Sequence, residues 1–246
     1  MHHIRQGSGR PLLLIHGLGS TWRSWKPILG MLSAEREVIA VDLPGFGDTP
    51  PLKGPVSIPT LADAATLFMA EQNLTGVDAV GSSMGARLVL ELSRRRVVGS
   101  VVSLDPGGFW QGWERTYFYR SISASIRLIR LLQPVMPAAT RNPVLRSLLF
   151  AQFSAHPSRL PPSLMLEEMR YYAASPSFDE LLRSLVFGPA QEGAPAGSAP
   201  GRVVIGWGRK DRVCPADPAS DIVEAISVAH ALGHAGNSME HVHGGS

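Results

Sequence analysis

Val80-Gly81-Ser82-Ser83-Met84-Gly85-Ala86 forms a G-x-S-x-G pentapeptide with its two flanking residues. Apolar residues precede it at 77–80, and apolar residues recur at helical spacing after it, over residues 86–92. A strand, a tight turn and a helix are the context in which this motif presents a serine nucleophile. A side chain at either glycine would crowd so tight a turn, which fits a strained backbone at the serine. We therefore predict that Ser83 is a nucleophile.

A serine nucleophile also needs a base, an acid that orients the base, and donors for the oxyanion that develops during attack. The apolar segment at residues 11–15 predicts a strand that runs directly into His16-Gly17-Leu18-Gly19. Backbone N–H groups of such a glycine-rich turn can face a developing negative charge. We assign the N–H groups of Leu18 and Met84 as the oxyanion donors.

A carboxylate follows the last apolar strand of the chain. Residues 202–208 predict this strand, and Asp211 comes just after it. Functional residues collect at the carboxyl ends of strands in open α/β sheets. Asp211 is therefore the predicted acid.

Four motifs resemble those of the α/β-hydrolase family, and the resemblance covers most of the chain. They are an oxyanion turn at residues 16–19, a D-x-P-G-x-G-x-S/T loop at 42–49, a nucleophile elbow at 81–85, and a G-x-x-D-x-x-x-P acid loop at 206–215. The resemblance implies an α/β fold with a mostly parallel central sheet, flanking helices and a helical cap. It also implies a catalytic triad in the order Ser, Asp, His.

The resemblance implies two candidates for the acid of the triad and two candidates for its base. Asp105, which ends the strand predicted at residues 98–104, is the alternative to Asp211, because the family occasionally uses that position. The family places its base in a Gly-His pair, which implies His234, 23 residues after Asp211. His241, 30 residues after Asp211, is the competing base.

The segment after His234 departs from the family pattern, because residues 235–240 lack the proline that usually follows and the helix expected at the end is missing. Two explanations stay open. Either the last strand and histidine loop are compressed into residues 221–243, or the natural end is lost through truncation or a frame change after Pro215. The second explanation implies an impaired hydrolase that binds ligands.

Strand and helix patterns alternate up to residue 105, as expected of βαβ units in a parallel sheet. Helical segments rich in arginine and aromatic residues then replace the strands until a strand returns near residue 202. We therefore predict a hydrolase core at residues 1–105, a helical cap with its linker at 106–200, and the rest of the core at 201–246. Further strands are predicted at 38–41 and 98–104, and helices at 60–73 and 86–95.

The predicted cap is rich in aromatic side chains, which either line a substrate pocket or pack in the core of the cap. Core packing is the expectation for most of them taken singly. The nine residues are Trp110, Trp113, Tyr117, Phe118, Tyr119, Tyr171, Tyr172, Phe178 and Phe187.

Other residues have structural explanations. His16 is expected to be a structural hydrogen-bonding residue, and Asp42 and Asp48 are expected to brace turns. His2 is expected to be solvated. Cys214, the single cysteine, lacks a positioned partner and excludes an internal disulfide.

Composition narrows the function further. At 246 residues and 44% hydrophobic content, the chain can bury a sizeable core. No apolar run reaches the roughly 20 residues of a membrane span, and no apolar signal region precedes the first strand. Together with the single cysteine, this favours the cytoplasm. The arginines are dispersed, so no nucleic acid is expected as a partner.

The sequence thus predicts a serine hydrolase with no metal or organic cofactor. Its substrate is expected to be a small, largely apolar molecule whose ester or related acyl bond is cleaved through an acyl-enzyme. A serine at the elbow argues against the aspartate chemistry of similar dehalogenases and epoxide hydrolases.

Overall fold

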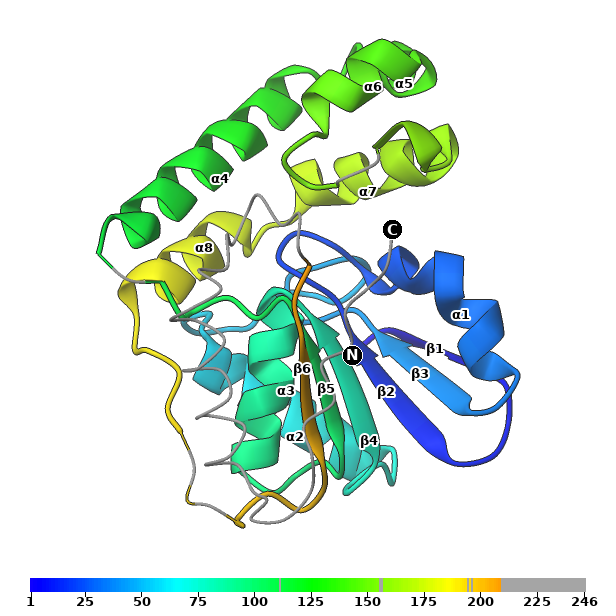
Figure 1. The fold of residues 1–246 in the computed structure, drawn as a ribbon, viewed down its shortest axis with the longest axis vertical. Helices are drawn as coiled ribbons and strands as arrows, with labels where there is room; N and C mark the ends of the chain where they lie inside the picture. The colour runs from blue at the N-terminus through cyan, green and yellow to red at the C-terminus, as the bar shows by residue number, and fades with distance from the viewer. Residues whose placement is uncertain (111, 155–156, 194, 196, 209–246) are drawn as a thin grey trace.

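The computed structural model describes residues 1–110, 112–154, 157–193, 195 and 197–208. Within this part of the chain, six strands form one sheet in the order β1-β3-β2-β4-β5-β6 (Figure 1). Only the edge strand β1 is antiparallel to its neighbour. The strands are β1 His3–Gln6, β2 Pro11–Ile15, β3 Glu37–Val41, β4 Asp78–Ser82, β5 Val101–Leu104 and β6 Val203–Gly206.

The register of the parallel strands aligns their carboxyl ends. Ile15 of β2 is opposite Gly81 of β4, and Ser82 of β4 is opposite Leu104 of β5. Leu104 in turn is opposite Gly206 of β6. The loops that follow these four strands therefore meet along one edge of the sheet, where open α/β folds bind their ligands.

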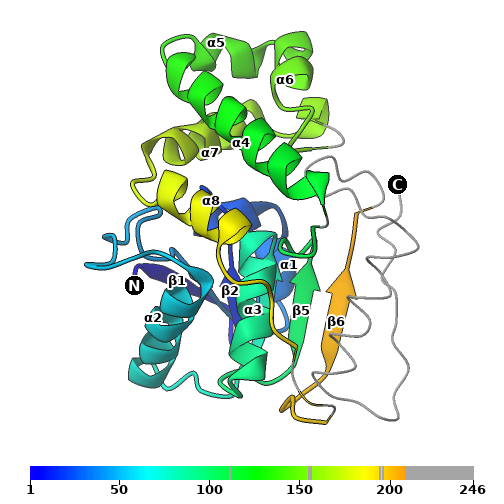
Figure 2. The same ribbon diagram turned by 90° about the vertical axis from the view of Figure 1, so that its left-hand side faces the viewer.

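Helices cover both faces of the sheet because its central strands are apolar on both sides (Figures 1 and 2). Leu13 and Ile15 pack in a cluster with α2 and α3, whereas Leu12 and Leu14 pack on the opposite face with η1 and α1. This alternation follows from the two-residue period of a strand. The elements are η1 Trp22–Trp25, α1 Lys26–Ser33, α2 Ile58–Glu71 and α3 Met84–Arg94.

A group of helices between β5 and β6 lies over the carboxyl edge of the sheet (Figure 2). Its members are α4 Trp113–Leu131, α5 Met136–Arg141, α6 Pro143–Leu149, η2 Pro157–Arg159, α7 Pro162–Ala174 and α8 Phe178–Phe187. We call these elements the helical insertion. They bury an apolar cluster of their own around Phe118, Phe150 and Phe178.

Arg87 ties the helical insertion to the core. Its side chain, on α3, is only 3% exposed. The guanidinium donates hydrogen bonds to the carbonyl oxygens of Leu185, at 3.2 Å, and Pro189. Burial lowers the pKa of Arg87 to about 10, so the group stays protonated at neutral pH.

The sequence prediction of a mostly parallel α/β sheet flanked by helices is confirmed. The strand at residues 11–15 matches β2, and the two predicted helices match α2 and α3 to within two residues. The strand predicted at 98–104 is too long, because residues 98–100 bend across the loop at Gly76 and β5 begins at Val101. Strand β1 and helix α1 were not predicted.

Among the described residues, none of the helices combines the length and apolar character that a membrane span requires.

Replacing Arg87 with Met is expected to destabilise the fold. The substitution keeps the length of the side chain but leaves the Leu185 and Pro189 carbonyls without their donor. We expect the free energy of unfolding to fall by about 2 kcal/mol or more, measured by urea denaturation. Arg170→Met, at an exposed position of α7, is the matched control and should change stability by less than about 0.5 kcal/mol. Equal stability of the two variants would contradict the role given to Arg87.

Candidate active site

Ser83 occupies a strained turn between β4 and α3. Its φ of 55° and ψ of −115° lie where L-residues are rarely found. The Ser83 N–H donates a 2.8 Å hydrogen bond to the carbonyl of Leu104, which fixes the turn to the neighbouring strand β5. The backbone thus holds the hydroxyl-bearing residue at the carboxyl edge of the sheet.

Two glycines allow this turn to form. A Cβ atom at Gly81 would lie 2.1 Å from the carbonyl oxygen of Gly85. A Cβ atom at Gly85 would lie 2.4 Å from the carbonyl oxygen of Ile15. Both contacts are with backbone atoms that cannot move aside, so the crowding predicted from the sequence is present in the structure.

The glycine-rich turn after β2 lies against Ser83. A Cβ atom built on Gly17 would be 3.9 Å from the Ser83 Oγ and 3.3 Å from its Cβ. Leu18 lines the same cavity as Ser83. Met84 begins α3, where a backbone N–H has no acceptor within its own helix. The two predicted oxyanion donors thus come from segments that meet at Ser83.

His16 holds the glycine-rich turn in place and uses both ring nitrogens to do so. Its Nδ1 lies 2.7 Å from the carbonyl oxygen of Gly17, and its Nε2 accepts a 3.0 Å hydrogen bond from the N–H of Leu43. These contacts require a neutral ring protonated on Nδ1. Burial lowers the pKa of His16 and favours the same neutral form. His16 is therefore a structural residue rather than a candidate base.

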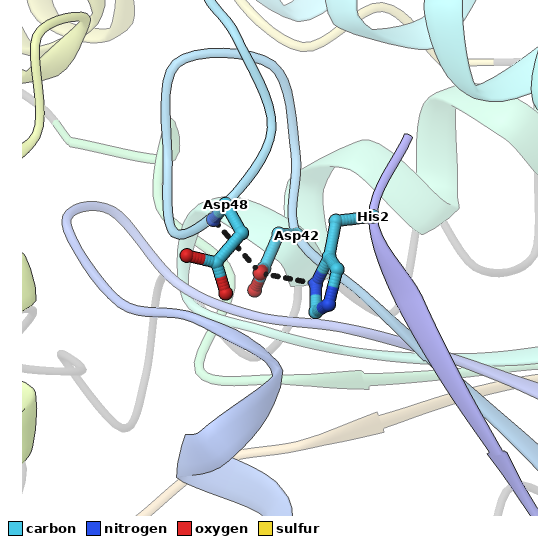
Figure 3. Close-up of side chains that lie close together, drawn as sticks. All are labelled: His2, Asp42 and Asp48. Carbon is cyan, nitrogen blue, oxygen red and sulfur yellow. Dashed lines mark hydrogen bonds and ion pairs between the residues drawn. The ribbon is translucent and has the colours of Figure 1, made fainter.

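Asp42 and Asp48 brace the loop after β3 (Figure 3). Asp42 accepts hydrogen bonds from the N–H groups of Trp22, at 2.8 Å, and Asp48, at 3.1 Å. The Nδ1 of His2 lies 2.8 Å from the Asp42 carboxylate, so His2 is not simply solvated as expected. Ligand atoms of His2, Asp42 and Asp48 lie within 4.8 Å of one another. Because Asp42 already accepts these bonds and Arg23 pairs with Asp48, turn bracing accounts for the cluster.

Of the two acids predicted from the sequence, Asp105 lies within the described residues and Asp211 does not. Asp105 directly follows β5 with a φ of 51°, and its Oδ1 accepts a 2.6 Å hydrogen bond from the N–H of Gly208. Asp105 and Ser83 line the same cavity. Asp211, His234 and His241 lie outside the described residues, so their roles stay predictions.

A cavity of about 600 Å³ opens beside Ser83, between the sheet edge and the helical insertion. Such a volume suits a small organic ligand. Its apolar wall comes largely from the helical insertion and includes Phe118, Ile122, Phe153, Met165, Met169 and Tyr172. Its polar members include Ser20, Ser24, Gln152 and Glu168. The sequence reasoning did not find this polar part.

The aromatic side chains of the predicted cap have three different environments. Phe118 and Tyr172 are buried and line the cavity. Phe178 is fully buried beneath Tyr172, with ring centroids 4.7 Å apart. Trp113 and Phe187 are 71% and 60% exposed, so the expectation of core packing is wrong for them.

Glu168, on α7, is a cavity residue with an unusual environment. Its Oε2 accepts a 2.6 Å hydrogen bond from the hydroxyl of Ser20, which follows the glycine-rich turn. Burial is the main cause that raises the pKa of Glu168 to about 7. The Ser20 hydrogen bond and the charges of Arg23 and Lys26 partly oppose this rise, while Glu167 adds to it.

Replacing Gly81 with Ala is expected to destabilise the protein, because the new Cβ meets backbone atoms of Gly85. We expect a loss of about 3 kcal/mol in the free energy of unfolding, measured by urea denaturation. Gly30→Ala is the matched control: Gly30 lies in α1 with nothing within 4 Å of the added Cβ. This control should gain about 0.5–1 kcal/mol from helix propensity. A neutral Gly81→Ala would refute the close approach.

Glu168 is expected to make stability depend on pH. Its folded pKa of about 7 exceeds the ordinary value of 4.5, so the folded protein retains a proton that the unfolded chain releases. The contribution of Glu168 to stability therefore falls as the pH rises from about 4.5 to 7. Glu168→Gln should match the parent protein near pH 4.5 and exceed its unfolding free energy at pH 8, by up to about 3 kcal/mol.

Glu167→Gln serves as the control for this pH series, because Glu167 pairs with Arg23 and Lys26. Losing those ion pairs should give no gain at pH 8. Chemical denaturation at both pH values measures the difference. A constant gap between Glu168→Gln and the parent protein would argue against the raised pKa.

Two curated proteins are similar to this chain over most of its length. The dihydrolipoyllysine-residue acetyltransferase component of the acetoin cleaving system from Cupriavidus necator is 30% identical over 88% of this chain and 56% of its own length. The 2-hydroxy-6-oxo-2,4-heptadienoate hydrolase of Pseudomonas putida is 27% identical over 95% of this chain and 84% of its own length. The chain thus spans only a little over half of the first relative.

Solved structures share the fold. The meta-cleavage product hydrolase from Pseudomonas fluorescens IP01 superposes with a TM-score of 0.65 at 20% identity, over 94% of this chain and 83% of that one. Residues 12–243 match the sequence pattern of the alpha/beta hydrolase family. This match spans nearly the whole sequence and includes the elbow and the glycine-rich turn, so the chain belongs to the alpha/beta hydrolase family.

Proposed function

We propose that this chain is a serine hydrolase that cleaves an ester or related acyl bond of a small substrate through an acyl-enzyme. The observation that carries the proposal is the strained Ser83 turn, which opens onto the cavity with the glycine-rich turn against it. Strain of this kind persists only where the surrounding structure enforces it, and it is common at active sites. The family's chemistry supports the same class of reaction.

The proposed mechanism has two halves. His234 removes the proton from the Ser83 hydroxyl as its oxygen attacks the acyl carbon, and the N–H groups of Leu18 and Met84 stabilise the oxyanion. His234 then gives the proton to the leaving alcohol, and the acyl-enzyme remains. His234 then takes a proton from a water molecule as the water oxygen attacks the acyl carbon. The bond to Ser83 breaks, the acid is released, and His234 returns the proton to the Ser83 oxygen. His241 is the alternative base.

Asp211 is the proposed acid that holds the imidazole and stabilises its charged form. Asp105 is the alternative, and its position in the cavity wall supports keeping it. Its carboxylate accepts a hydrogen bond from the Gly208 N–H. If Asp211 is the acid, Asp211→Asn should lower activity, and if Asp105 is the acid, Asp105→Asn should do so.

We propose that the helical insertion acts as the cap of the active site, within the domain division at residues 106–200. Its apolar side chains form most of the cavity wall beside Ser83. Excluding water from such a cavity strengthens the hydrogen bonds that stabilise an oxyanion. No cofactor is needed for this chemistry.

A second candidate is cleavage of a carbon–carbon bond next to a carbonyl. The names of a heptadienoate hydrolase and a meta-cleavage product hydrolase among the similar proteins favour it. The same serine, acid and histidine serve such a reaction. An impaired hydrolase that only binds ligands is the alternative if neither bond is cleaved.

Ser83→Ala is expected to lower kcat/KM for short-chain 4-nitrophenyl esters by at least about 10³-fold, because it removes the hydroxyl proposed to form the acyl-enzyme. Release of 4-nitrophenolate measures the rate. Ser82→Ala is the matched control in the same turn and should keep readily measurable turnover. Hydrolysis that survives in Ser83→Ala would refute the nucleophile.

The same assay assigns the remaining residues. His234→Ala and His241→Ala identify the base, while Asp211→Asn and Asp105→Asn identify the acid. A ring-cleavage product with a carbon–carbon bond next to a carbonyl replaces the ester to test the second candidate. Ligand binding without turnover of either substrate would favour the impaired hydrolase.

A further inference from the structure

Glu168 carries a polar atom that the proposed mechanism does not use. Its Oε2 is bound by the Ser20 hydroxyl, but its Oε1 is buried and accepts no hydrogen bond from the described residues. Leaving a buried carboxylate oxygen without a donor is unfavourable, and native proteins rarely do so without a functional reason. Glu168 lines the cavity that also contains Ser83.

The neighbouring Glu167 shows that Glu168 is not required for ion pairing. Glu167 lies 3.2 Å from the Arg23 guanidinium and 2.6 Å from the Lys26 ammonium group. These two cations are therefore already paired. Glu168, the next residue of α7, instead lines the cavity, as do Met165 and Met169 of the same helix.

The surroundings of Glu168 favour a neutral donor over a cation. The Oε1 atom is buried in a cavity lined by Met165 and Met169, where an ammonium group would lose its hydration at a large cost in free energy. A hydroxyl group avoids most of this cost, because it is easier to remove from water than a charged group is.

We propose that Glu168 is a specificity-determining residue whose Oε1 accepts a hydrogen bond from a hydroxyl group on the acyl part of the substrate. The cavity would then prefer hydroxylated acyl substrates to purely apolar ones of the same size. This inference rests on the proposed function, because the substrate must lie between Ser83 and Glu168. It changes the expected substrate from a largely apolar molecule to one with a polar group at a defined distance from the scissile carbonyl.

The test compares methyl ω-hydroxyalkanoates of increasing chain length with methyl alkanoates that have the same number of non-hydrogen atoms. Preference is the ratio of kcat/KM within each pair. At the chain length that reaches Glu168, we expect Glu168→Met to lower this ratio by tenfold or more, or about 1.4 kcal/mol. Glu168→Gln retains a carbonyl acceptor and should keep the ratio within about threefold of the parent protein.

Two controls keep the outcome clear. Glu167→Gln removes the neighbouring carboxylate and should leave the ratio unchanged. Glu168→Ala repeats the test if Glu168→Met does not fold, which the near-ultraviolet circular dichroism spectrum reveals. A ratio that is the same in the parent protein and in Glu168→Met or Glu168→Ala would overturn the proposal. A higher kcat/KM of the parent protein for the methyl ω-aminoalkanoate of the same length than for the hydroxyl ester would also overturn it.

A binding experiment separates failure of this proposal from failure of the proposed function. Calorimetric titration of the same ester pairs into Ser83→Ala protein needs no turnover. We expect the hydroxyl ester to bind at least tenfold more weakly when Glu168→Met is added. Equal binding would overturn the role of Glu168 even if Ser83 proves catalytic, whereas a tenfold loss would support it even if no ester is hydrolysed.

Discussion

The close approach of three backbone segments at the Ser83 turn is the constraint on which the rest of the site depends. Gly81 must lie against the carbonyl of Gly85, and Gly85 against the carbonyl of Ile15. The Ser83 N–H is bound to the Leu104 carbonyl as well. Strands β2, β4 and β5 therefore have to be in register before the serine can take its positive φ. Once they are, the loops that carry Leu18 and Asp105 are brought to the same edge.

The sequence could predict this part of the fold because its signals are local. Buried parallel strands are continuous apolar runs, and the glycines of the elbow mark the turn between strand and helix. The antiparallel edge strand β1 is a short, mostly polar segment, so its pairing with β3 depends on tertiary contacts that no local pattern shows. Helix α1 was missed for a similar reason, because Pro27 and Gly30 weaken its helical pattern.

In the candidate site, the sequence could predict only those residues that belong to a recognisable motif. Ser83 and the glycine-rich turn belong to such motifs, and both meet at the cavity. Glu167 and Glu168 look alike in sequence, as two charged residues on an amphipathic helix. One pairs with Arg23 and Lys26 near the surface, and the other lies in the cavity wall. This difference arises from the packing of α7 on the loop at Ser20, which sequence periodicity cannot resolve.

The helical insertion is held to the core by contacts that begin on segments adjoining the site. Arg87, which binds the Leu185 carbonyl of α8, lies one turn along the helix that begins after Ser83. Ser20, which binds Glu168 of α7, comes directly after the glycine-rich turn. Tyr172 packs so closely on Gly19 that a Cβ atom there would lie 2.4 Å from its ring. Because Ser20 and Tyr172 also line the cavity, a change in how the insertion packs on the core would move the cavity walls beside Ser83.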